Sequence, residues 1–152
     1  MSVGDEEAAR MARAQLPSGL RPETLAVRTA LAPSQHGENS EGLFLTSAYV
    51  QPDAATSARR FAEMEDFTYT RTSNPTVRSF EARLAAMEGA EAAVATSTGM
   101  SAILLLIMGL LKSGDHVVCS RSVFGSTQGL FGKEFAKFGV QTTFVPQTDI
   151  TE

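Results

Sequence analysis

Apolar residues recur at helical spacing in the segment 74–89, NPTVRSFEARLAAMEG. Val77, Phe80, Leu84 and Met87 follow one another at intervals of three or four residues, which places them on one face of a helix. The segment opens with Asn and Pro, which favour a helix start, and closes with Gly, which favours a helix end. The pattern therefore predicts a helix with one apolar stripe.

Beyond this helix, short apolar runs alternate with longer helical patterns. Expected strands cover 90–97, 116–119 and 140–145, and expected helices cover 100–112 and 127–138. A strand–helix–strand order implies right-handed crossovers and a parallel sheet. The fold class predicted for this part of the chain is therefore α/β.

Both helices of this part carry large apolar side chains. The run 102–111, AILLLIMGLL, has no charge but is far shorter than the ~20 residues that cross a bilayer. We therefore predict that it is a fully buried helix rather than a membrane span. The second helix, 127–138, is amphipathic and should face inward with four side chains: Leu130, Phe131, Phe135 and Phe138.

The first 68 residues differ from the rest, being rich in Ala, Arg, Glu, Ser and Pro with only short apolar patches. Their pattern predicts a short helix over 21–31, a loop over 33–42, a strand or extended segment over 43–50 and a short helix over 56–65. This stretch can bury little by itself. We interpret residues 1–68 as an arm that lies on another surface, and 69–152 as the start of a larger domain.

Composition narrows the function classes. The 152 residues are 43% hydrophobic and 20% charged with a net charge of -4, which disfavours a nucleic-acid binder. The single cysteine, Cys119, excludes an internal disulfide and fits a reducing compartment; on a strand it is expected to be a small buried hydrophobe. The N-terminus has no apolar core of a secretory signal. His36 and His116 have no metal-site spacing.

The connection between the expected strand 90–97 and the next helix is a first candidate for chemistry. Ser97, Thr98, Gly99 and Met100 stand where helix amides lack intrahelical partners and attract anions such as phosphate. Gly99 permits close approach of a ligand, and the hydroxyl groups could add donors. The alternative is a tight connection with a capping hydroxyl, and the motif alone does not decide between them.

A second candidate is the segment 67–76, FTYTRTSNPT. Tyr69 and Arg71 are two residues apart, so along an extended chain they lie on the same side and could bind one phosphate together. The alternative is a polar loop in which Asn74 caps the following helix.

A third candidate, SRSVFGSTQG at 120–129, follows the expected strand 116–119. Ligands of open α/β sheets bind at the carboxyl ends of strands. Phe124 lies among serines and glycine, where its ring could stack on a flat heterocycle. The alternative is an ordinary residue of a satellite core.

Five motifs in order carry a resemblance to a known family. They are Y-T-R-T-S-N-P-T (69–76), L-A-A-M-E-G (84–89), S-T-G-M-S-A-I (97–103), G-D-H-V-V (114–118) and F-G-S-T (124–127). The chain resembles the N-terminal part of the pyridoxal-phosphate enzymes of cysteine and methionine metabolism. Within that family, Y-T-R-T-S-N-P-T and C-S-R-S-V-F-G-S-T are most similar to the O-succinylhomoserine sulfhydrylase branch.

The resemblance implies an aspartate-aminotransferase-like (fold type I) architecture and pyridoxal 5'-phosphate as cofactor. It implies that Gly99, Met100 and Ser97 bind the cofactor phosphate. Tyr69 and Arg71 would bind the phosphate held by a neighbouring subunit, over which the polar arm would reach. It also implies that Phe124 stacks on the pyridine ring where most of the family has tyrosine, so that any role of that hydroxyl is in doubt here.

The resemblance also implies that two catalytic groups lie outside this chain. The family attaches its cofactor to a lysine in Ser/Thr-rich surroundings, and none of Lys112, Lys133 and Lys137 has such surroundings. Asp149 does not occupy the place of the aspartate that pairs with the pyridine nitrogen. No catalytic residue is therefore assigned, and these 152 residues are interpreted as an N-terminal piece, inactive alone.

For the complete protein the resemblance implies a cytoplasmic homotetramer, built as a dimer of dimers, that replaces the succinyl group of O-succinylhomoserine with sulfide. Two other functions stay open at this point. One is a different activity of the family, such as a cystathionine γ-synthase or a cystathionine or methionine γ-lyase. The other is a non-catalytic structural or partner-binding role.

Overall fold

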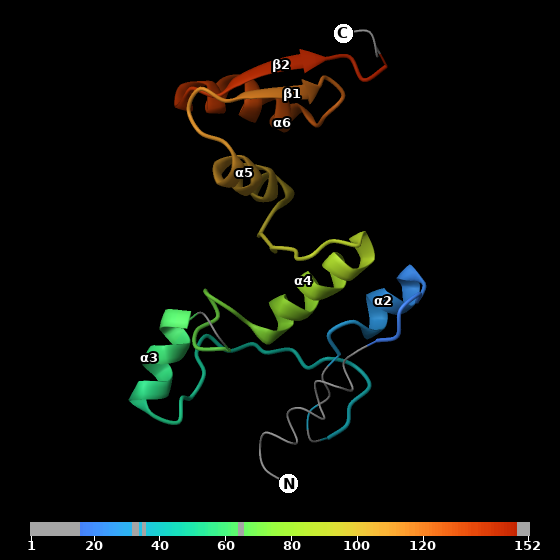
Figure 1. The fold of residues 1–152 in the computed structure, drawn as a ribbon, viewed down its shortest axis with the longest axis vertical. Helices are drawn as coiled ribbons and strands as arrows, with labels where there is room; N and C mark the ends of the chain where they lie inside the picture. Colours follow the sequence, from blue (N-terminus) through green and yellow to red (C-terminus); the bar gives the residue numbers. More distant parts are fainter. Residues whose placement is uncertain (1–15, 32–33, 35, 64–65, 149–152) are drawn as a thin grey trace. The chain divides into compact units, whose positions relative to one another are not determined.

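The computed structural model describes residues 16–31, 34, 36–63 and 66–148 (Figure 1). Asp149 lies outside the described residues, as do the first fifteen residues of the predicted arm. The chain divides into two compact units, one ending at Ala95 and the other beginning at Thr96. The proposed division into an arm and a larger domain stays a prediction.

The described residues of the first unit include the helices α2 (Pro22–Arg28), α3 (Ala54–Glu63) and α4 (Pro75–Glu88). The expected ends of α4 are confirmed. The side chain of Asn74 accepts a hydrogen bond from the backbone N–H of Thr76, and Gly89 ends the helix with φ 64 in the left-handed region.

The apolar stripe of α4 is largely uncovered by the described residues. Its four members are 39% to 56% exposed, and Ala85 is the buried residue of this helix. Helix α4 packs against α2, and Arg83 of α4 makes polar contacts with the residue after α2 and with the loop beyond it. The Arg83 guanidinium donates to the Thr29 carbonyl oxygen at 2.9 Å and forms a two-fold ion pair with the Glu41 carboxylate at 2.5 and 2.7 Å.

The pH dependence of the unfolding free energy in Glu41→Gln tests this ion pair. Hydrogen bonds from Arg83 lower the pKa of Glu41 from its ordinary 4.5 to about 2. Because the folded-state pKa is depressed, the stabilisation is complete above pH 4.5 and disappears as the pH falls towards 2. We expect the variant to lose about 1–2 kcal/mol of unfolding free energy at pH 7 for this partly exposed pair.

Urea unfolding at several pH values measures this difference, which should vanish near pH 2. Glu23→Gln is the matched control, since the Arg21–Glu23 pair is largely exposed and should contribute almost nothing. If Glu41→Gln lost the same unfolding free energy at every pH, the lowered pKa of Glu41 in the ion pair with Arg83 would be contradicted.

The second unit is built from a helix and a two-stranded parallel sheet. Helix α5 (Gly99–Leu110) precedes β1 (His116–Ser120), and β1 pairs with β2 (Gln141–Val145) with His116 opposite Gln141. The crossover between the strands is helical from Gly125 to Phe138, comprising α6 (Gly125–Gly129), the π-helical turn η1 (Leu130–Glu134) and the 3₁₀ turn η2 (Phe135–Phe138). The predicted parallel pairing of the last two strands is confirmed.

The predicted strand at 90–97 is wrong for this structure. Residues 90–96 are irregular, and the described residues offer them no neighbouring strand. A β-strand is stable only when a neighbour satisfies its backbone groups, so an apolar segment without such a neighbour stays irregular.

A small core lies between α5 and the crossover. Ile107, Phe135 and Val140 are buried in it, and Leu130 and Phe131 pack against them. The inward orientation predicted for Leu130, Phe131 and Phe135 is confirmed, as is burial of Cys119, which is 8% exposed. Three further half-buried side chains pack against this core, namely Ile103, Leu111 and Val117.

Two predictions of burial in this unit are wrong. Phe138 is 63% exposed, because the change from π to 3₁₀ geometry rotates the last turn away from the face that a regular helix would present. Helix α5 is not buried all round. Ile107 is its buried residue, whereas Leu106 and Leu110 are 60% and 73% exposed, since the described residues supply too little apolar surface to cover them.

Gly139→Ala should destabilise the second unit. Gly139 ends the crossover at φ +79, and an added Cβ would lie 2.3 Å from Ser113 Oγ. The strained φ and the clash together should cost about 2–3 kcal/mol of unfolding free energy. Gly89→Ala is the control, because its φ is also positive but nothing lies within 4 Å, so it should cost about 1 kcal/mol. Equal shifts in the urea midpoint would contradict the predicted clash.

Candidate functional site

The start of α5 combines a helix cap with amides that have no partner. Thr98 is the N-cap, and its hydroxyl oxygen accepts a hydrogen bond from the Ser101 amide at 3.0 Å. In the described part of the chain, the amides of Gly99 and Met100 donate to no acceptor. The capping alternative is therefore correct for Thr98, but it uses only one of the amides and leaves room for an anion at the other two.

The space in front of Gly99 is open. A Cβ placed on Gly99 would meet no atom within 4 Å. The neighbouring Ser97 is exposed, and its hydroxyl has no hydrogen-bond partner among the described residues. Two free amides, a free hydroxyl and the positive end of a twelve-residue helix thus face accessible space.

Phe124 stands at the start of α6 and is 71% exposed. The alternative that it belongs to a satellite core is therefore wrong for the described residues. Its carbonyl oxygen accepts from the amides of Thr127 and Gln128, which fixes the backbone that carries the ring. An exposed aromatic face on a rigid turn is suited to stacking on a flat ring.

A contact between Thr127 and Met100 connects the starts of α5 and α6. The Thr127 hydroxyl, buried with its residue at 6% exposure, donates to Met100 Sδ at 3.8 Å. This contact brings the segment of Phe124 close to the amides at Gly99. Sequence reasoning missed Thr127, although it is the last residue of the F-G-S-T motif.

Tyr69 and Arg71, which belong to the first unit, lie together. The Arg71 guanidinium carbon is 5.5 Å from the centroid of the Tyr69 ring. Both residues are exposed, and within the described residues Arg71 forms no ion pair. The pair therefore offers an uncompensated positive charge and a phenol hydroxyl on one surface.

The groups of each unit, taken separately, fit parts of a phosphorylated aromatic cofactor. Amides at a helix start and a guanidinium suit a phosphate dianion, and the exposed ring of Phe124 suits a heterocycle. Of the three lysines, Lys137 is paired with Glu134 at 2.6 Å, and Lys112 and Lys133 are exposed. The described residues contain no group of acids, cysteines and histidines suited to a metal ion, and none of their helices could cross a bilayer.

Comparison with known proteins places the chain in a family. Residues 23–152 match the sequence profile of the family described as Cys/Met metabolism PLP-dependent enzyme. An O-succinylhomoserine sulfhydrylase of Pseudomonas aeruginosa is 56% identical over 129 residues, covering 84% of this chain and 32% of the relative. A Mycobacterium tuberculosis protein of the same name is 40% identical over 149 residues, covering 97% and 36%.

Other activities occur among the relatives. An L-methionine gamma-lyase of Fusobacterium nucleatum is 37% identical over 130 residues, covering 85% of this chain and 33% of that protein. The chain spans about a third of the length of these curated relatives.

A solved structure shows the same fold. The crystal structure of an O-acetylhomoserine (thiol)-lyase of Campylobacter jejuni, which contains a pyridoxyl-lysine phosphate, superposes with a TM-score of 0.79 at 29% identity, covering 87% of this chain and 33% of that chain. The predicted α/β fold of type I pyridoxal-phosphate enzymes is therefore confirmed. The chain belongs to the family of pyridoxal-phosphate-dependent enzymes of cysteine and methionine metabolism.

Proposed function

We propose that this chain works as part of a longer pyridoxal-phosphate enzyme that converts O-succinyl-L-homoserine and sulfide to L-homocysteine and succinate. The family is established by the match over residues 23–152. The observation that supports the site is the open start of α5, where two amides have no partners among the described residues. The Thr127–Met100 contact joins it to α6, whose first turn carries the exposed ring of Phe124. The names of the two sulfhydrylase relatives support the choice of substrate.

In this proposal each group of the site has one task. The amides of Gly99 and Met100, with the hydroxyl of Ser97, bind the cofactor phosphate. Tyr69 and Arg71 bind the phosphate of a neighbouring subunit's cofactor and so complete the site across a dimer interface. The bound cofactor supplies an electron sink for the carbon atoms of the substrate.

Phe124 holds the ring of the cofactor by stacking alone. It has no hydroxyl, so it cannot move a proton or bind the substrate amine there. Proton transfer must then come from other groups of the complete enzyme, and Phe124 contributes orientation.

Assays of the complete protein test the substrate. O-Succinylhomoserine with sulfide should give homocysteine and succinate, and replacing sulfide by cysteine should give much less product. Efficient use of cysteine would favour a cystathionine γ-synthase. Release of an α-keto acid from methionine or cystathionine would favour a γ-lyase, the activity named for the Fusobacterium relative. Comparison of O-succinyl with O-acetyl homoserine determines the preferred ester.

The non-catalytic alternative makes a different prediction. A complete protein without the expected lysine would not attach pyridoxal phosphate covalently, would turn over no substrate, and would show no absorbance band beyond that of free pyridoxal phosphate. We further propose a cytoplasmic homotetramer, for which light scattering of the complete protein should give four subunits. The 152 residues alone should be inactive, because the lysine that attaches the cofactor is not among them.

A further inference from the structure

Asn74 makes more contacts than a helix cap requires. A cap needs only its side-chain oxygen, which here accepts from the Thr76 amide at 2.8 Å. Its amide nitrogen lies within hydrogen-bond distance of three further acceptors, the Phe44 carbonyl oxygen at 3.0 Å, the Tyr49 hydroxyl at 3.2 Å and Thr70 Oγ1 at 3.2 Å. Asn74 is 4% exposed, so these bonds satisfy a group that water does not reach.

We propose that Asn74 is a positioning residue that holds the segment Tyr69–Arg71 in the geometry that binds phosphate. This inference rests on the proposed function, in which Tyr69 and Arg71 contact the cofactor phosphate. Asn74 acts on them through Thr70, and touches no reacting group itself.

Thr70 is the point at which Asn74 holds the segment. It is half-buried, whereas Tyr69 and Arg71 on either side are exposed. The Thr70 amide donates to the Ser47 carbonyl oxygen at 2.9 Å, and its hydroxyl donates to the carbonyl oxygen of Thr46. That hydroxyl also accepts from Asn74, so its orientation is fixed from two sides.

The partner of this segment is the extended stretch 43–50, which Asn74 also contacts. Ala48 and Tyr69 form an antiparallel bridge, and the Tyr49 amide donates to the Thr68 carbonyl oxygen at 3.2 Å. Asn74 binds this stretch at Phe44 and Tyr49. Between these two positions lie the carbonyl oxygens of Thr46 and Ser47, which accept from Thr70. One buried amide therefore joins α4, the extended stretch and the phosphate-binding segment.

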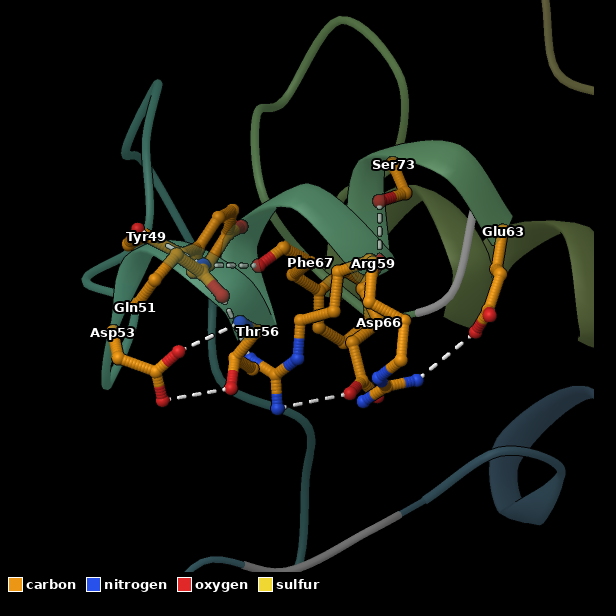
Figure 2. Close-up of polar contacts among 10 residues, drawn as sticks. Tyr49, Gln51, Asp53, Thr56, Arg59, Glu63, Asp66, Phe67 and Ser73 are labelled. Carbon is orange, nitrogen blue, oxygen red and sulfur yellow. Dashed lines mark hydrogen bonds and ion pairs between the residues drawn. The ribbon is translucent and has the colours of Figure 1, made fainter.

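On the other side of the Ala48–Tyr69 bridge, Tyr49 and Phe67 are held by a separate set of hydrogen bonds (Figure 2). The Gln51 side-chain amide donates to the carbonyl oxygens of Tyr49 and Phe67, both at 3.1 Å, and Gln51 in turn accepts from Arg60 on α3 at 2.9 Å. The segment is thus fixed before and after Tyr69. Such a frame reduces the conformational entropy that Arg71 loses on binding an anion.

Asn74→Asp separates positioning from capping, because aspartate still caps α4 but has no amide hydrogens to donate. Thr70→Val is a second variant, which removes the hydroxyl and leaves the cap untouched. In the complete enzyme each should raise the dissociation constant for pyridoxal phosphate by about tenfold, a loss of the size seen for outer-shell partners of metal ligands. Cofactor titration followed by absorbance measures this constant.

A double-mutant cycle with Arg71→Ala decides whether the effect passes through Arg71. If Asn74 positions this residue, Asn74→Asp should weaken cofactor binding in the wild-type background and change it less than about twofold in the Arg71→Ala background. Asp53→Ala is the matched control. The Asp53 carboxylate accepts a hydrogen bond from the Thr56 amide at 2.7 Å, so the substitution removes a cap from α3 without touching Thr70. It should leave cofactor affinity unchanged.

Three results would overturn the inference. Additive losses in the double mutant would mean that Asn74 acts independently of Arg71. Unchanged affinity in both Asn74→Asp and Thr70→Val would also overturn it, whatever their thermal stability. If Arg71→Ala itself had no effect on affinity, the proposed contact of Arg71 with the cofactor phosphate would be contradicted. The positioning role of Asn74, which depends on that contact, would then be contradicted as well.

Discussion

Replacement of Arg71 by alanine should raise the dissociation constant for pyridoxal phosphate by about 30- to 100-fold in the complete enzyme. The guanidinium is exposed and forms no ion pair within the described residues, so its charge is available to an anion. Charge-assisted bonds to a phosphate are among the stronger hydrogen bonds of proteins. Cofactor titration of the freshly prepared apoenzyme measures the change.

Arg71→Lys should recover only part of the affinity, because lysine keeps the charge and loses the two-pronged geometry. Arg28→Ala is the control for loss of one positive charge, since Arg28 is also exposed and its guanidinium donates to the Asn39 side-chain oxygen at 2.8 Å. It should not change the dissociation constant. Equal effects of Arg28→Ala and Arg71→Ala would show a general charge effect and contradict a specific phosphate contact.

Gly99→Val should reduce cofactor affinity by about a hundredfold or more while leaving the stability of the protein nearly unchanged. A side chain at Gly99 would occupy open space, so the fold can accept it. The same space is where we propose that the cofactor phosphate approaches the free amides, and a branched side chain would keep it out. Cofactor titration and thermal unfolding of the apoenzyme together measure the two effects.

Gly109→Ala is the matched control on the same helix. A Cβ there also meets nothing within 4 Å, and alanine favours a helix over glycine by about 1 kcal/mol. This variant should be as stable as the parent or more so, with unchanged cofactor affinity. A Gly99→Val enzyme that still bound the cofactor normally would refute the phosphate site at the start of α5.

Signals that act over a few residues predicted the structure best. The ends of α4 followed from Asn74, Pro75 and Gly89, whose effects depend only on neighbouring backbone groups. Burial was predicted less well. The segment 90–97 and the apolar face of α5 need partners that the described residues do not contain, and a sequence pattern cannot show which partner is present.

The same difference between local signals and distant partners applies to the candidate site and to other contacts of the fold. The free amides at Gly99 and the exposed ring of Phe124 could be expected from a glycine-containing turn and from polar flanks. The contact of Thr127 with Met100 joins positions 27 residues apart, and the pair of Arg83 with Glu41 joins positions 42 apart. Contacts of that range depend on how the whole chain folds, so no local rule indicates them.

The alternation of exposed Tyr69, half-buried Thr70 and exposed Arg71 has an evolutionary consequence. Adding or deleting a single codon between Thr68 and Asn74 would exchange the hydroxyl that faces the interior for one of the groups that face outward. Libraries with random insertions should therefore tolerate longer sequences at the surface turn near Gly37, and reject changes of length at this segment even when every original amino acid is retained.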